Sequence, residues 1–347
     1  QTDFGVGGGG GNAVENMVRN NVEGVDFIII NTDVAALKSK DGNTMERVQI
    51  GRKTTKGRGA GGKPPVAAES AKENSDDIAE VLKGASLVFV AAGMGGGTGT
   101  GAAPVIAQIA KDMGILTVGV VTKPFAFEGK RRMTQAEQGI AELSACVDSL
   151  IIVPNERLKY VSDTSITLQN AFAIADDVLR QGVQSISDLI LLPGLVNLDF
   201  ADVTSVMKDA GYAHMGMGSA TGKDKATVAA DMAISSPLLE TSIDGAKGLI
   251  INITASADVS LDDIDAASTM IKDKVSDDAN IIWGAVIDDK MEDAISVTVI
   301  ATGFNADGQI AKKNLTDAVS SASAPVAAKE EPKPATKDKT DDDDDTF

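Results

Sequence analysis

The sequence contains one cysteine, one histidine and no apolar run of membrane-spanning length. Cys146 has no second cysteine to pair with, and we interpret it as an inert, buried helix residue. His214 has no neighbouring His or Cys, which argues against a zinc site or a Ser-His-Asp triad. Lys111 and Asp112 interrupt the longest apolar candidate, so neither membrane insertion nor a signal segment is expected. These absences predict a cytoplasmic protein.

Positive charge and aromatic side chains are also scarce. The 32 Lys and Arg residues face 50 Asp and Glu residues, and the net charge of −18 argues against binding to nucleic acid through phosphate attraction. The aromatic residues are nine Phe, two Tyr and one Trp, against 35 Gly, which predicts an aliphatic core with many tight turns. A chain of 347 residues, 43% of them hydrophobic, is long enough for about two globular domains.

Predominantly apolar runs at 25–30, 87–93, 115–121 and 149–153 alternate with segments of helical periodicity. Strands that are apolar throughout are typical of a parallel sheet covered by helices on both faces, so we predict a Rossmann-like α/β domain. A long helix is expected over 174–190. Further apolar runs at 248–255, 280–287 and 294–303, with a helix over 261–275, predict a smaller C-terminal α+β domain.

The predicted domain boundaries follow from these elements. Residues 1–172 form the first domain, 173–195 the central helix, 196–304 the C-terminal domain, and 305–347 an acidic tail. The tail is rich in Ala, Ser, Lys, Pro and Asp and has few large apolar residues, so we expect it to be disordered.

Two glycine runs each precede a predicted helix. The first run, Gly7–Gly11, overlaps a G-x-G-x-x-G match formed by Gly5, Gly7 and Gly10, and Asp33 follows the next strand, as in dinucleotide-binding oxidoreductases. The second, "GGGTGTG" at Gly95–Gly101, follows another buried strand, and Thr98 and Thr100 add hydroxyl groups. Two such turns at the ends of neighbouring strands would direct backbone N–H groups at a single polyphosphate.

A third glycine-rich stretch, Gly57–Lys63, nearly matches the phosphate loop G-x-x-x-x-G-K-[ST]. Pro64 replaces the hydroxyl residue that should meet a metal, and no apolar strand precedes the stretch. We therefore exclude it as a phosphate loop.

At this point the chain resembles a known family. "GGGTGTG" is similar to the signature of the tubulin/FtsZ superfamily, and "TKPFAFEGKRR", "VDSLIIVPN", "LRQGVQSISDLI" and "PGLVNLDFADV" resemble the bacterial FtsZ family. The resemblance covers Gly5–Gly303. It implies a GTPase that binds GTP/GDP with Mg²⁺, hydrolyses GTP on assembly, and polymerises head-to-tail. It also implies division-ring proteins as partners and a place at the mid-cell division ring.

The resemblance further implies site residues. Those that would bind the nucleotide are Gly8, Gly9, Gly10, Gly11, Asn12, Gly95, Gly96, Gly97, Thr98, Gly99, Glu128, Arg132, Asn155, Phe172 and Asp176. Asn197, Asp199 and Asp202 would enter the site of the next subunit and orient the attacking water. The metal ligands are unknown. From the residues alone, Glu128 and Arg132 form a solvated i,i+4 pair, and Phe172 packs in a core.

The chain departs from the FtsZ family at two places, and two alternative functions stay open. Only four residues precede Gly5, so the first strand is expected to be short or missing. The chain ends in "TDDDDDTF" and lacks the apolar peptide with which FtsZ proteins dock on membrane-linked partners. The alternatives to a GTPase are the dinucleotide-dependent oxidoreductase and a tubulin-like protein that binds nucleotide without turnover.

Overall fold

The computed structural model describes residues 1–20, 22, 24–38, 45–160, 167, 170–191, 199–239, 242–257, 259–288 and 291–304. The strands are β1 (Thr2–Val6), β2 (Asp26–Asn31), β3 (Met45–Gln49), β4 (Leu87–Gly93), β5 (Leu116–Lys123), β6 (Ser149–Pro154), β7 (Gly211–Thr221), β8 (Gly248–Ala255), β9 (Asn280–Ile287) and β10 (Ala294–Thr302).

The α-helices are α1 (Gly7–Arg19), α2 (Val34–Lys38), α3 (Pro64–Glu73), α4 (Ser75–Val81), α5 (Thr98–Asp112), α6 (Lys130–Ser144), α7 (Ala171–Leu191), α8 (Phe200–Met207), α9 (Lys225–Ile234) and α10 (Leu261–Lys272). Two short 3₁₀ helices, η1 (Ala126–Glu128) and η2 (Asn155–Tyr160), follow β5 and β6. Every helix in the described part of the chain is too short or too polar to cross a membrane.

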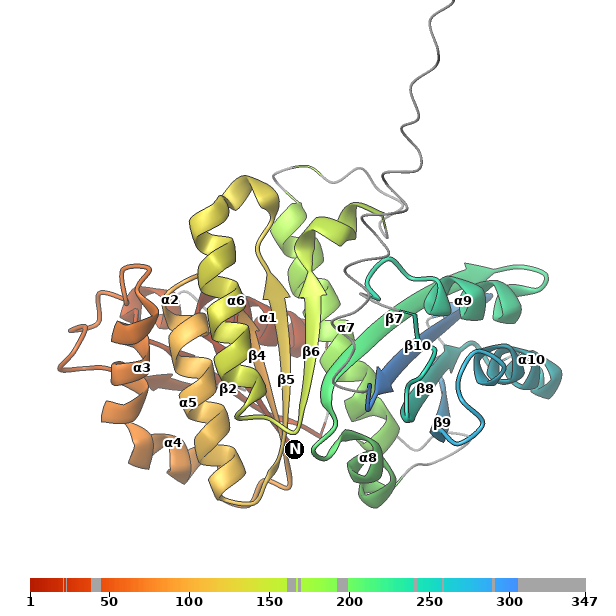
Figure 1. Ribbon diagram of the computed structural model, residues 1–347, viewed down its shortest axis with the longest axis horizontal. Helices are drawn as coiled ribbons and strands as arrows, with labels where there is room; N and C mark the ends of the chain where they lie inside the picture. Colours follow the sequence, from red (N-terminus) through yellow and green to blue (C-terminus); the bar gives the residue numbers. More distant parts are fainter. Residues whose placement is uncertain are drawn as a thin grey trace, which may run out of the picture. The chain divides into compact units, whose positions relative to one another are not determined.

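The ten strands form one sheet in the order β3-β2-β1-β4-β5-β6-β7-β10-β8-β9 (Figure 1). All pairs from β3 to β7 are parallel, β10 is antiparallel to both β7 and β8, and β8 and β9 are parallel. The parallel part confirms the predicted Rossmann-like α/β domain, and β7–β10 with α9 and α10 confirm the smaller α+β part. Residues 1–306 form one compact unit. The finer domain boundaries stay a prediction, and the tail lies outside the described residues.

Helices cover both faces of the parallel part. One core layer joins α1 and α7 to side chains such as Phe27, Phe89 and Val118, and the other joins α3–α6 to Phe4, Val88 and their neighbours. Side chains of α8, β8, β9 and β10 share the core layer that contains α7. The central helix therefore packs against both the parallel and the antiparallel parts of the sheet. A third core layer lies between α9, α10 and the outer face of β8 and β10.

Three predictions are corrected. The first strand is not missing: Thr2–Val6 form a strand of five buried residues that pairs with both β2 and β4. Gly7–Gly11 do not precede a helix as a loop but form the first turns of α1. Cys146 is partly exposed and lies in the turn after α6 ends at Ser144, and burial raises the pKa of its thiol.

Candidate functional site

In the turn from β1 into α1, the backbone of α1 lies in close contact with the backbone of the neighbouring strands. Gly7 has a φ of 74°, in the left-handed region that favours glycine. A Cβ on Gly5 would lie 2.5 Å from the Gly10 carbonyl oxygen, and one on Gly10 would lie 2.1 Å from the Ala91 carbonyl oxygen of β4. The start of α1 therefore lies directly on the backbone of β1 and β4, where any side chain would collide.

The turn from β4 into α5 lies beside the first. A Cβ on Gly7 would be 2.8 Å from the Gly99 nitrogen, and one on Gly99 would be 2.7 Å from the Gly93 carbonyl oxygen. The buried Thr100 hydroxyl accepts the Gly95 N–H at 2.9 Å, so it closes this turn. The N-termini of α1 and α5 thus meet at one edge of the sheet, as the sequence predicts for a polyphosphate site.

Two glycines in these turns have no neighbour that would exclude a side chain. Apart from its chain neighbours and, at Gly8, the backbone of its own helix, a Cβ on Gly8 or on Gly96 would have no heavy atom within 4 Å, and neither residue has a positive φ. The fold alone therefore gives no reason for glycine at these two positions. Open space in front of two helix N-termini fits an anion that contacts the backbone directly.

The stretch Gly57–Lys63, which the sequence analysis excluded as a phosphate loop, lies beside the glycine turns, a proximity that the sequence did not predict. A Cβ on Gly97 would lie 3.0 Å from Ala60 Cβ, 3.1 Å from the Lys63 nitrogen and 3.2 Å from the Gly62 nitrogen. Lys63 is the N-cap of α3, so a third helix begins beside the two glycine turns. The glycine content of 57–63 was a usable signal. The two reasons for excluding it as a phosphate loop still hold, because β3 ends at Gln49, well before Gly57, and Pro64 occupies the hydroxyl position.

The end of β2 joins this cluster. Thr32 Oγ1 and Thr98 Oγ1 are hydrogen-bonded at 2.8 Å. The neighbouring Asp33 accepts the Ala35 N–H at 2.9 Å and so caps α2. The carboxylate on which the dinucleotide alternative rests therefore has a local structural role.

The other predicted contacts lie along the same edge at the ends of β5 and β6, which are two and three strand spacings from β1, about 10 and 14 Å. Phe172 is 45% exposed rather than packed in the core, and Asp176 follows it by one turn of α7. Asn155 is buried and its Oδ1 has no hydrogen-bond partner in the described structure. A buried polar atom without a partner is costly, so it fits a ligand that supplies a donor.

The Phe172 ring belongs to a group of three rings that the sequence analysis did not foresee. Its edge meets Phe125 and Phe127, at centroid distances of 5.7 and 6.2 Å, and Phe125 and Phe127 are stacked at 5.2 Å. Phe125 is buried, but Phe127 is 56% exposed. The group therefore presents apolar ring surface at the end of the site that lies away from the helix N-termini.

Glu128 and Arg132 form the i,i+4 ion pair expected from the residues alone. Glu128 Oε1 also accepts the Phe125 N–H at 2.9 Å, so the carboxylate closes the turn that carries Phe127. The Arg132 side chain stays half exposed beside it.

Asp199 and Asp202 lie at the opposite edge of the sheet. Together they cap α8: the Asp202 N–H donates to Asp199 Oδ1 at 2.8 Å, and the Asp199 N–H donates to Asp202 Oδ2 at 3.2 Å. The last residue of α8, Met207, accepts a hydrogen bond from Ser149, the first residue of β6. The structure therefore does not bring Asp199 and Asp202 to the glycine turns. Asn197 lies outside the described residues.

Comparison with known proteins identifies the family. Residues 3–163 match the model of the tubulin/FtsZ family GTPase domain, and residues 211–305 match the FtsZ family C-terminal domain. An FtsZ dimer from M. jannaschii, described as empty, is 39% identical, with a TM-score of 0.84 and coverage of 87% of each chain. The chain belongs to the tubulin/FtsZ family.

More distant members share the fold. A CetZ2 structure from Haloferax volcanii, described as a GTPgS-bound protofilament, is 20% identical with a TM-score of 0.71, and it covers 92% of this chain and 98% of its own. A GDP-bound CetZ1 monomer from the same organism is 18% identical with a TM-score of 0.73, at 93% and 99% coverage. Family membership supports guanine-nucleotide binding and a GTPase domain, and it removes the basis for the oxidoreductase alternative.

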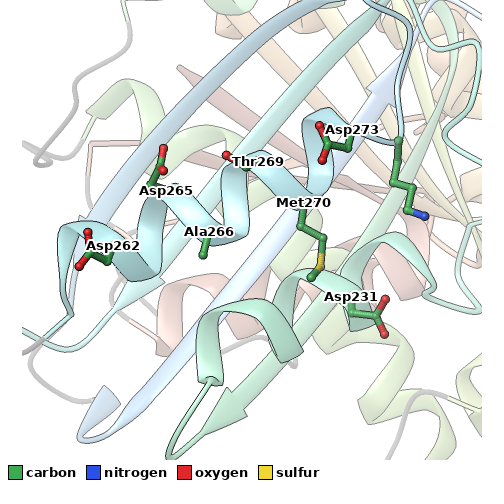
Figure 2. Close-up of a pocket in the computed structure, with 8 residues that line it drawn as sticks. Asp231, Asp262, Asp265, Ala266, Thr269, Met270 and Asp273 are labelled. Carbon is green, nitrogen blue, oxygen red and sulfur yellow. The ribbon is translucent and has the colours of Figure 1, made fainter.

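One hollow of the molecule lies away from the glycine turns and differs from them in charge. A hollow of about 690 Å³ lies between α9 and α10, in the C-terminal part (Figure 2). Its lining includes four aspartates, Asp231, Asp262, Asp265 and Asp273, which would repel a triphosphate. That hollow is therefore a poor nucleotide site, and the candidate site of this GTPase domain is the open edge formed by the glycine turns.

No group of three or more His, Cys, Asp or Glu side chains in the described part of the chain could hold a metal ion. Mg²⁺ in nucleotide sites is held largely by phosphate and water oxygens, with one or two protein ligands. The donors at the glycine turns are Thr hydroxyls and backbone groups. They fit a metal that arrives with the nucleotide rather than one held by the protein.

Proposed function

We propose that this protein binds GTP at the C-terminal edge of its parallel sheet and hydrolyses it when chains assemble head-to-tail into filaments. The observation that carries the first part is the open space at Gly8 and Gly96. Neither packing nor backbone conformation requires glycine there, whereas phosphates resting on the N-termini of α1 and α5 do.

Guanine would occupy the other end of the same edge. Phe172 offers an exposed ring for stacking, Asp176 a carboxylate for the guanine N–H groups, and Asn155 an unpartnered acceptor. Glu128 and Arg132 follow β5, the strand between β4 and β6, and would contact the ribose and the nearby phosphate. Gly9–Asn12, Gly95, Gly97, Thr98 and Gly99 would complete the phosphate cradle.

The dependence of hydrolysis on assembly follows from topology. Asp199 and Asp202 are separated from the glycine turns by about the length of a strand, on the order of 20 Å for strands of six to eight residues. A carboxylate cannot reach across that distance within one chain. The acidic end of one chain would instead meet the nucleotide of the next, where the carboxylates orient the attacking water.

Mg²⁺ would supply charge stabilisation on the phosphates when bound with the nucleotide. The chain's own contribution is to orient the phosphates on backbone N–H groups and to present Thr98 beside them. By its family, the filament would serve the division ring at mid-cell, where other division-ring proteins would bind it. The bacterial origin implied by the resemblance stays a prediction.

Two measurements test the proposal together. Displacement of fluorescent GTP by unlabelled GTP, ATP and NAD reports specificity, and we expect ATP and NAD to compete only weakly. Phosphate release across a range of protein concentrations, with Mg²⁺, reports turnover. We expect the rate per chain to be near zero at concentrations too low for sedimentable polymer and to rise above that point. Full turnover by dilute monomers would refute the shared site, and GTP binding without turnover at any concentration would favour the non-hydrolysing alternative.

A further inference from the structure

Three of the nine phenylalanines gather at one end of the glycine-turn edge. Phe172 lies in the first turn of α7 and is the ring that the proposed function assigns to the base. Phe125 and Phe127 belong to the turn between β5 and α6. A half-exposed ring can rotate about its side-chain bonds, so stacking on a base requires neighbours that fix its plane.

The planes of the three rings are nearly at right angles or nearly parallel. Phe125 and Phe127 are stacked with their planes 14° apart, and Phe172 stands at 90° to Phe125 and at 83° to Phe127. Perpendicular and offset-stacked rings at these centroid distances attract each other, because positive ring edges meet negative ring faces. Phe172 therefore contacts two parallel rings at once, and a rotation of its plane would weaken both contacts.

Burial differs among the three rings. Phe125 is 1% exposed, whereas Phe172 is 45% and Phe127 56% exposed. Phe125 thus packs in the core, but burial in the core does not account for Phe127. The two exposed rings are in contact and form an apolar surface at the edge where a nucleotide would lie. A flat aromatic base is the kind of ligand that would cover them.

The turn that carries Phe127 is bonded on two sides. The Phe125 N–H donates to Glu128 Oε1 at 2.9 Å, and the Ala126 N–H donates to Glu156 Oε2 at 3.0 Å. Glu156 directly follows Asn155, whose buried side-chain oxygen has no partner in the described structure. Phe127 is therefore an exposed ring on a fixed backbone, which is what a support for another ring requires.

The rings begin where the phosphate cradle ends. A Cβ on Gly95 would lie 2.7 Å from Pro124 Cγ, and Pro124 directly precedes Phe125 in the chain. The second glycine turn and the ring group are therefore in contact through Pro124. A nucleotide with its phosphates on the glycine turns would reach the ring group with its base.

We propose that Phe127 is a positioning residue of the base site, which holds the Phe172 ring in the plane on which a purine stacks. This inference rests on the proposed function and adds a residue that acts through Phe172 rather than on the phosphates. Stacking of a base on an aromatic side chain is worth roughly 5- to 100-fold in affinity. Loss of the supporting ring should cost part of that factor.

A double-mutant cycle tests the proposal on the full chain, with Mg²⁺ and below the critical concentration for assembly. Displacement of fluorescent GTP, whose affinity is first measured for each variant, gives the affinity for GTP. We expect Phe172→Ala to lower it at least about tenfold and Phe127→Ala about fivefold. The double variant should bind within about twofold of Phe172→Ala alone, because Phe127 has no ring left to position.

Inorganic tripolyphosphate is the second probe, since it has phosphates but no base. Its affinity should stay within about twofold of the parent value in all three variants, whereas damage to the cradle would lower it as well. Phe127→Tyr keeps a ring and should bind GTP within about twofold of the parent. Phe127→Leu keeps apolar volume without a ring and should bind as weakly as Phe127→Ala.

Tyr212→Ala is the matched control for loss of an exposed ring. Tyr212 is 47% exposed at the start of β7, away from the glycine turns. Its replacement should leave the affinities for GTP and for tripolyphosphate unchanged.

Four results would overturn the positioning role. They are unchanged GTP affinity in Phe127→Ala, additive losses in the double variant, parent-like binding by Phe127→Leu, and equal losses for GTP and tripolyphosphate. Additive losses would mean that Phe127 contacts the base by itself. Unchanged GTP affinity in Phe172→Ala, or no GTP binding by the parent chain, would instead refute the base site of the proposed function.

Discussion

The parallel and antiparallel parts of the sheet both contain glycines at close approaches, but for different reasons. In β7, a Cβ on Gly216 would lie 2.1 Å from the Ala233 carbonyl oxygen, and one on Gly218 would lie 2.1 Å from that of Ala229. Both oxygens belong to α9, so glycine there lets a helix pack on a strand. At the starts of α1 and α5, Gly8 and Gly96 face open space.

The difference separates structural glycines from those kept free for a ligand. Where protein atoms fill the volume of the missing side chain, glycine serves the fold. Where the volume is empty and φ is ordinary, an alanine would fit the folded chain, and at Gly8, which lies in α1, it would even favour the helix by about 0.5–1 kcal/mol. Glycine at such a position therefore indicates that a ligand occupies the space of the missing side chain.

The largest expected effect is on the fold. Gly218→Ala places a Cβ against the Ala229 carbonyl oxygen and 2.6 Å from Met232 Cβ, so α9 must move away from β7. We expect a loss of several kcal/mol in the free energy of unfolding, more than the ~1–3 kcal/mol typical of overpacking. Urea denaturation followed by circular dichroism measures it. A loss below about 1 kcal/mol would show that α9 shifts freely and would weaken the comparison.

The next effect compares two aspartates with the same local role. Asp202 in α8 and Asp263 in α10 each occupy the third position of a helix capping box. Replacement by Asn keeps a side-chain oxygen for the cap but removes the charge. We expect Asp202→Asn to lower GTP hydrolysis about a hundredfold at equal polymer mass, as for loss of a catalytic proton acceptor, and Asp263→Asn to leave it unchanged.

Phosphate release per mass of pelleted polymer is the measurement for both variants. Equal turnover by Asp202→Asn and the parent chain would remove Asp202 from the site. Equal losses in both variants would show a general effect of surface charge.

A smaller effect is expected at the open glycines. Gly8→Ala should leave the free energy of unfolding unchanged or raise it by up to about 1 kcal/mol, because Ala is the better helix former. Its affinity for GTP should fall at least about tenfold, since the Cβ occupies space that the phosphates need. Thermal denaturation without nucleotide and titration with fluorescent GTP give the two values. Undiminished affinity would mean that the space at Gly8 has another cause.

The smallest expected effect concerns α7, which packs against both parts of the sheet. Burial raises the pKa of the Asp188 carboxyl to about 6, against the opposing influence of Gln184 and Arg180. The folded state therefore favours the protonated form of Asp188. The stability that this protonation contributes is fully present below about pH 4 and is lost as the pH rises through about 6.

Asp188→Asn removes the ionisable group and with it the loss of stability at high pH. The variant should therefore be more stable than the parent by about 1–2 kcal/mol at pH 8, and the difference should vanish towards pH 4. Urea denaturation at several pH values measures it. A difference independent of pH would show that the side-chain amide acts through packing or hydrogen bonding instead.

Much of the fold was predictable from the sequence, because a run of apolar residues is enough to identify a buried strand. Strands β4, β8 and β9 begin and end where the apolar runs do. Strand β7 was not foreseen, because its alternation of glycine, methionine and polar residues reflects packing against α9 rather than uniform burial. The start of α1 was misjudged because five glycines have a low helix propensity, which packing on β1 and β4 overrides.

By itself, the sequence determined that apolar strands alternate with helices and that two glycine runs face one edge, because both depend on residues adjacent in the chain. Tertiary structure alone decided which distant segments meet there. It brought residues 60–63 beside Gly97, gathered Phe125, Phe127 and Phe172, and placed Asp199 and Asp202 at the opposite edge. Contacts between segments far apart in the chain depend on strand order and helix packing, which no local pattern encodes.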